Sequence, residues 1–150
     1  MYPGPAEPTA AAKVDSTLFC TAACPTEDKA LFAVGTSEGL HTLEGARDRW
    51  TYSDKPFPQN GIQNFKRRHN SSHACVTAVD WLSTNVIASG LRDSTVFLHD
   101  LRSNGSAARL QHPHTVSKLL RVDEHRIVVA GHDTVSSLEF VECMATDSKI

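Results

Sequence analysis

The stretch that decides the fold is Val86-Ile87-Ala88-Ser89-Gly90-Leu91-Arg92-Asp93-Ser94-Thr95-Val96-Phe97-Leu98. It contains two apolar runs of strand length that are rich in β-branched residues, the composition typical of β-strands. Between them stand glycine, aspartate and serine, the residues that favour tight turns. The stretch therefore predicts a β-hairpin.

The same plan occurs twice more, at residues 31–43 and 127–138, with the third copy one residue shorter before its acidic residue. The glycines that mark the three copies, Gly35, Gly90 and Gly131, lie 55 and 41 residues apart. An interval of ~40–45 residues is the period of one four-stranded propeller blade. The longer interval then equals that period plus an insertion, so the sequence predicts repeated β-hairpins.

The composition is that of a globular protein without a dominant charge. The chain has 150 residues, of which 40% are hydrophobic and 21% charged, with a net charge of -2. This balance gives no general attraction to nucleic acid or to anionic membranes. Four cysteines without a CxxC pair indicate neither a zinc site nor a disulfide framework. We expect no cofactor and no metal.

The chain divides into an expected flexible leader, rich in Pro and Ala, at residues 1–14 and repeats at 15–150. We place the repeats at about 15–51, 73–111 and 112–143, with a long surface loop at about 52–72. The basic cluster Lys66-Arg67-Arg68-His69 lies in that loop. We interpret it as a solvated segment, the alternatives being a contact with an acidic partner or a nuclear address. Because only Phe65 accompanies it, nucleic-acid binding is not expected.

No secretory signal is recognisable and no apolar run approaches the roughly 20 residues of a membrane span. We therefore expect no membrane partner, and an intracellular location in the nucleus or the cytoplasm.

The second repeat runs from His73 through a strand ending at Trp81, a strand ending Ser89-Gly90, an acidic turn, and a strand closing on His99-Asp100. This order resembles a blade of the WD-repeat family, with His99 where the family usually has Trp. The resemblance covers about residues 17–141. It implies an all-β propeller fragment of about two to three four-stranded antiparallel blades.

The resemblance also implies a polar cluster that locks the second blade, formed by His73, Ser89 and Asp93. An aspartate in the turn accepts hydrogen bonds from backbone amides and from the histidine, and the serine bonds the same histidine. In the third repeat the matching residues are His112 and Asp133, with Ala130 in place of the serine.

In the first repeat Glu38 replaces the aspartate and no histidine precedes it. We therefore expect the first blade to depend on packing alone.

The run Val96-Phe97-Leu98-His99-Asp100-Leu101-Arg102 is similar to the WDxR box of WD-repeat substrate receptors of cullin-RING ubiquitin ligases. This similarity implies that Arg102 contacts the ligase adaptor and that Asp100 orients the loop. A guanidinium with five donors suits a carboxylate or carbonyl cluster at an interface. The alternative is a general scaffold in another nuclear or cytoplasmic complex, such as one in chromatin, RNA processing or signalling.

We expect no enzymatic activity. The eight histidines form no HExxH pattern, and Cys75, close to His73 in sequence, is expected to be buried in a strand rather than to act as a nucleophile. Two complete blades and part of a third do not close a ring, which usually takes 4–8. We therefore expect a truncated or divergent chain, or one that associates with other copies to complete its ring.

Overall fold

The computed structural model describes residues 4, 12–26, 28, 30–46, 49–53, 56–57, 75–103, 106–131 and 135–139, with the backbone alone at 106–107 and 135–139. Most of the expected leader and loop therefore lies outside the described residues, as do His73, Asp133 and the basic cluster of the loop.

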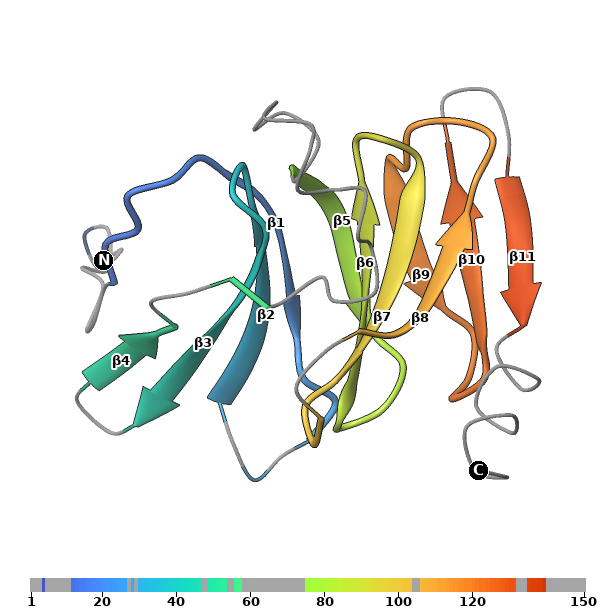
Figure 1. Cartoon of the computed structure of the whole chain (residues 1–150). Coiled ribbons are helices and arrows are strands. Elements are labelled where there is room, and N and C mark those ends of the chain that lie inside the picture. Colours follow the sequence, from blue (N-terminus) through green and yellow to red (C-terminus); the bar gives the residue numbers. More distant parts are fainter. Residues whose placement is uncertain are drawn as a thin grey trace.

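Three antiparallel sheets stand side by side along the chain (Figure 1). The first holds β1 (Leu18–Ala23), β2 (Ala30–Thr36), β3 (Leu40–Ala46) and β4 (Arg49–Tyr52), each strand pairing with the next. The second holds β5 (Val76–Trp81), β6 (Val86–Leu91), β7 (Thr95–Asp100) and β8 (Ser106–Gln111) in the same order. The third holds β9 (Lys118–Arg121), β10 (Arg126–Ala130) and β11 (Val135–Glu139). The prediction of an all-β fold made of repeated antiparallel sheets is confirmed.

The first two sheets repeat even their irregularity. The β1–β2 pairing shifts register between Leu18 and Cys20, and the β5–β6 pairing shifts between Val76 and Ala78. An extra residue on one strand of a pair bends that strand and increases its twist. Gly35 is the partner of Cys20 and Gly90 that of Ala78, so the two repeats match residue by residue here.

Equivalent positions in the second and third sheets are one residue closer in sequence than Gly90 and Gly131 are. The β5–β6 turn closes with Leu82 N donating to Val86 O, and the β9–β10 turn closes with Val122 N donating to Arg126 O. This pairing sets Val129 at the position of Ser89, and the assignment of Ala130 to that position is wrong.

The reason for the shift lies at Gly131, which follows β10. A Cβ atom there would be 2.7 Å from Cε1 of His112. Gly131 is therefore required by the imidazole beside it, and it does not mark the end of the repeated strand.

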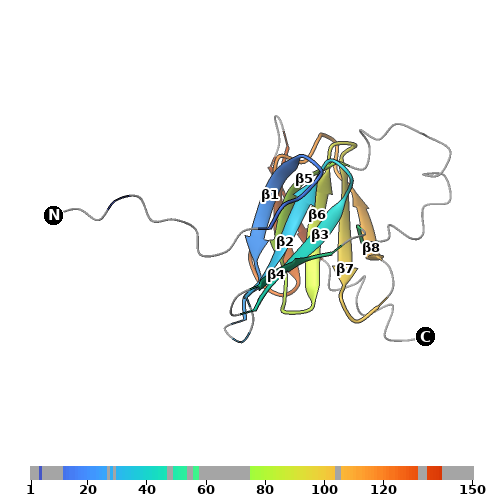
Figure 2. The ribbon, with the colours of Figure 1, turned by 90° about the vertical axis from the view of Figure 1, so that its left-hand side faces the viewer.

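The apolar cores lie between neighbouring sheets. Side chains alternate along a strand, so Ile87 and Ala88 of β6 face opposite ways. Ile87 faces the first sheet and lies in one core with Trp81 of its own sheet and Leu40 of the first. Ala88 faces the third sheet and lies in the other core with Ile127. The indole Nε1 of Trp81 also donates to Ala22 O at 2.9 Å. Figure 2, viewed from the side of the first sheet, shows the sheets one behind another.

Candidate protein-binding site

The turn after β7 is organised by one carboxylate. Oδ1 of Asp100 accepts hydrogen bonds from the backbone N and from Nε of Arg102, both at 2.9 Å, and Oδ2 accepts one from Nη2 at 2.8 Å. Leu101 N donates to Asn85 O at 2.8 Å, which fixes the turn to the β5–β6 loop. The guanidinium of Arg102 is therefore held in one orientation.

The pair is open to solvent on the arginine side. The side chain of Arg102 is 66% exposed and that of Asp100 is 19% exposed. The hydrogen bond from Arg102 lowers the pKa of Asp100, and the same bond raises the pKa of Arg102. Both groups are therefore charged at neutral pH, and Arg102 is an exposed guanidinium that its bonds to Asp100 hold in one orientation.

This turn lies at the lower edge of the sheets in Figure 1, where the β5–β6 and β9–β10 turns also lie. The β9–β10 turn carries a second pair, in which Nε and Nη2 of Arg126 contact Oδ2 of Asp123 at 2.6 Å. The structure therefore places two exposed Asp–Arg pairs on neighbouring sheets at one edge.

The hydrogen bond of Ser89 goes to His99. The Oγ atom lies 2.9 Å from Nε2 of His99, and the two residues are 0% and 1% exposed. The imidazole packs against Phe57 and Phe97 at centroid distances of 5.7 and 6.0 Å. Burial lowers the pKa of His99 to about 4, so the ring is neutral at physiological pH.

Asp93 acts within its own turn, where Oδ1 accepts a hydrogen bond from Thr95 N at 3.0 Å. His112 is 2% exposed, and its backbone N donates to Ser94 O at 2.8 Å. Its Nδ1 lies 2.9 Å from His114 O. Because His73 and Asp133 lie outside the described residues, the expected histidine–aspartate clusters stay predictions.

The first sheet differs from the expectation that it depends on packing alone. Val34 and Leu43 stand at the positions of Ser89 and His99, so the pair is apolar there. However, His41 is 2% exposed and its Nδ1 lies 3.0 Å from Ser53 O. Its ring stacks on Tyr52 at 4.7 Å. No sequence pattern predicts this contact, because Ser53 lies beyond the repeated stretch.

No protein-family model matches the sequence, and no curated protein matches it. The β-propeller domain of Myceliophteria thermophila Cps50 (Swd1) is similar in structure, with a TM-score of 0.67 and 10% sequence identity over 85% of this chain and 42% of that chain. Kluyvelomyces marxianus Hsv2 is also similar, with a TM-score of 0.54 and 13% identity over 84% of this chain and 36% of that chain.

The three sheets are blades of a β-propeller. The chain spans less than half the length of each of these two propeller-like structures. Within the blades, Asp100 and Arg102 lie at an edge turn and not in a core between blades, so a partner can reach Arg102 without separating them.

Among the residues that the structure describes, no three His, Cys, Asp or Glu side chains gather in a way that would hold a metal ion. Over the same residues, no helix is long and apolar enough to cross a membrane.

Proposed function

We propose that this chain is a WD-repeat scaffold that binds other proteins and carries out no catalysis, and that Arg102 is a direct contact for a partner. The observation that carries the proposal is the Asp100–Arg102 pair, in which the half-buried carboxylate of Asp100 orients an arginine side chain that remains 66% exposed. An arginine fixed in this way loses little side-chain entropy when it binds.

The chemistry of the turn favours an acidic or carbonyl-rich partner surface. Arginine is enriched among the residues that dominate binding energy at protein interfaces. Hydrogen bonds between a guanidinium and a carboxylate are short and about twice as strong as neutral ones. Because two of the three guanidinium nitrogens of Arg102 contact Asp100, a partner adds bonds to a group that is already aligned.

We further propose that this partner is the adaptor of a cullin-RING ubiquitin ligase. The support is the similarity of residues 96–102 to a WDxR box, together with the geometry of the turn, in which Asp100 orients Arg102. A general scaffold in another complex is the competing function. It predicts partners whose binding does not depend on Arg102.

A pull-down from cell extract, read by mass spectrometry, separates the two functions. Arg102→Glu reverses the charge at the proposed contact, and Arg126→Glu is the matched control because Arg126 also pairs with an aspartate at the same edge, on the next blade. The adaptor should be recovered with the wild type and with Arg126→Glu, and lost with Arg102→Glu. Partners retained equally by all three proteins would favour the general scaffold.

A further inference from the structure

An exposed aromatic side chain lies against an exposed cation at the junction of the first and second blades. Phe19, on β1, is 43% exposed, and the guanidinium carbon of Arg92, in the β6–β7 turn, lies 5.8 Å from the centroid of its ring. A cation at this distance from the face of an aromatic ring is attracted by the ring. Because the two residues come from different blades, the pair exists only where the blades meet.

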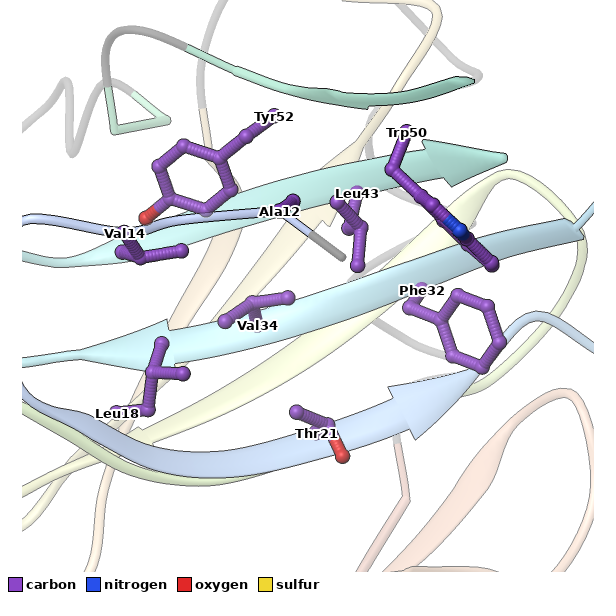
Figure 3. Close-up of a pocket in the computed structure, with 9 residues that line it drawn as sticks. All are labelled: Ala12, Val14, Leu18, Thr21, Phe32, Val34, Leu43, Trp50 and Tyr52. Atoms are coloured by element: carbon purple, nitrogen blue, oxygen red, sulfur yellow. The ribbon is translucent and has the colours of Figure 1, made fainter. Parts of the chain in front are cut away.

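The pair does not belong to the outer face of the first sheet. Leu18, the residue before Phe19, lines an apolar hollow on that face with Val34 (Figure 3). Phe19 instead contacts Arg92 of the second blade. β1 begins at the upper edge of the sheets in Figure 1, where the β6–β7 turn also lies, and the turn that carries Arg102 lies at the opposite edge. The pair therefore forms a surface separate from that turn.

The packing of the first blade does not account for an aromatic residue at position 19. Phe19 is the extra residue where the β1–β2 pairing shifts register, and Thr77 is the extra residue of β5. The hydroxyl of Thr77 donates to Gly90 O at 3.2 Å, and the hydroxyl of the equivalent Ser117 donates to Ala130 O at 2.9 Å. The other two blades thus fill this position with a short side chain that bonds to its own sheet. The ring of Phe19 cannot donate such a bond, so it serves a contact of another kind.

Arg92 is an exposed cation without a carboxylate partner. Its backbone is fixed on both sides, because its N donates to Cys75 O at 3.1 Å and its O accepts from Thr115 Oγ1 at 2.8 Å. Arg102 and Arg126 each pair with an aspartate nearby in sequence, whereas no carboxylate of the described residues lies within salt-bridge distance of the Arg92 guanidinium. The N–H donors of Arg92 are therefore available to an acceptor.

We propose that Phe19 and Arg92 bind an acidic segment of a partner protein, in which a carboxylate adjoins a large apolar side chain. The carboxylate accepts hydrogen bonds from the guanidinium, which are among the strong hydrogen bonds of proteins. The apolar side chain packs on the ring of Phe19. Aromatic residues and arginine are both enriched in the cores of protein interfaces. A segment that covers the pair also excludes water from it, and the attraction between a cation and an aromatic ring is stronger out of water.

Selection from a display library of random peptides, with the 150-residue chain as the bait, identifies sequences that bind. The enriched peptides should share an aspartate or a glutamate beside a large apolar residue. Fluorescence anisotropy then measures the dissociation constant of one enriched peptide that carries a fluorescein label.

Phe19→Thr removes the ring and places there the residue type that the second blade has at the equivalent position, so the blade keeps its fold. This variant should bind the labelled peptide at least about tenfold more weakly than the wild type, as the loss of an interface hot spot does. Arg102→Glu is the matched control, because it changes an exposed arginine at the opposite edge. It should bind the peptide as the wild type does.

A charge exchange tests whether Arg92 contacts the acidic residue directly. Arg92→Glu should lose the acidic peptide and should bind a peptide that has lysine in place of the acidic residue. The wild type should bind this lysine peptide at least about tenfold more weakly than the acidic one. Circular dichroism of each variant verifies that the sheets are intact. Enriched peptides without an acidic residue, equal binding by Phe19→Thr, or no binding of the lysine peptide by Arg92→Glu would each overturn the proposal.

Discussion

Ser89 and His99 lie on neighbouring strands of the middle blade, with Oγ 2.9 Å from Nε2, and both are almost fully buried. They are diagonal partners, since Ser89 pairs directly with Phe97 and Ile87 pairs with His99. A buried polar atom without a partner is costly. The contact therefore satisfies Nε2 of His99, whereas Nδ1 of the same ring is buried without a hydrogen-bond partner among the described residues.

Removing one member of this pair should destabilise the chain more than removing both. Ser89→Ala leaves Nε2 of His99 without its partner, and we expect a loss of about 1–3 kcal/mol of unfolding free energy. The double variant Ser89→Val with His99→Leu reproduces the pair Val34 and Leu43 of the first blade. It should recover most of that loss in urea denaturation. Equal destabilisation by the two variants would refute the account.

The stability should fall as the pH decreases from about 6.5 to about 4. Burial lowers the pKa of His99 from 6.5 to about 4, so the unfolded chain binds a proton in this window that the folded chain does not. The contribution of the neutral His99 to the unfolding free energy is fully present when the pH is above the pKa in the unfolded chain. About 3 kcal/mol of it is lost once the pH has fallen to the pKa in the folded chain. Urea denaturation at several pH values measures the slope. His99→Leu should show a shallower slope, and an unchanged slope would exclude His99 as its source.

The carboxylate of Asp80 joins two blades, because Oδ1 accepts from Trp81 N at 2.8 Å and Oδ2 accepts from Arg121 N at 2.7 Å. Asp80→Ala should cost about 1–3 kcal/mol. It should also reduce the hydrogen-exchange protection of the Arg121 amide. Asp123→Ala is the control, since Asp123 bonds within its own turn. Undiminished protection of Arg121 in Asp80→Ala would contradict the assigned bond.

Gly90 allows the second and third blades to approach closely. A Cβ atom at Gly90 would lie 2.7 Å from Cβ of Val116. Gly90→Ala should therefore destabilise the chain by about 1–3 kcal/mol, as overpacking does. The double variant Gly90→Ala with Val116→Ala should lose less unfolding free energy than the sum of the losses in the two single variants. Gly4→Ala, with open space around it, should leave the melting temperature unchanged. Additive losses would refute a direct clash.

The repeated hairpin was predictable because its determinants are local. Strand composition and the turn residues of 86–98 act within about a dozen residues, and the same plan at 31–43 predicts the same structure there. The predicted alignment of the third repeat is one residue off because it equates Gly131 with Gly90. Gly131 is set by the ring of His112, which comes from another part of the blade.

Contacts between strands and blades were less predictable. The bond between Ser89 and His99 depends on a diagonal relation that only the strand register fixes. The bond from Arg121 N to Asp80 requires the relative placement of two blades. In contrast, Asp100 and Arg102 are two residues apart, so their pairing follows from the turn itself.

Equilibrium titration of the purified chain with a purified cullin-RING ligase adaptor tests the central claim most directly. The account predicts that the wild type and Arg126→Glu bind with the same dissociation constant and that Arg102→Glu weakens binding at least about tenfold, the effect of a lost interface hot spot of about 1.4 kcal/mol or more. No binding by the wild type, or equal binding by Arg102→Glu, would contradict it.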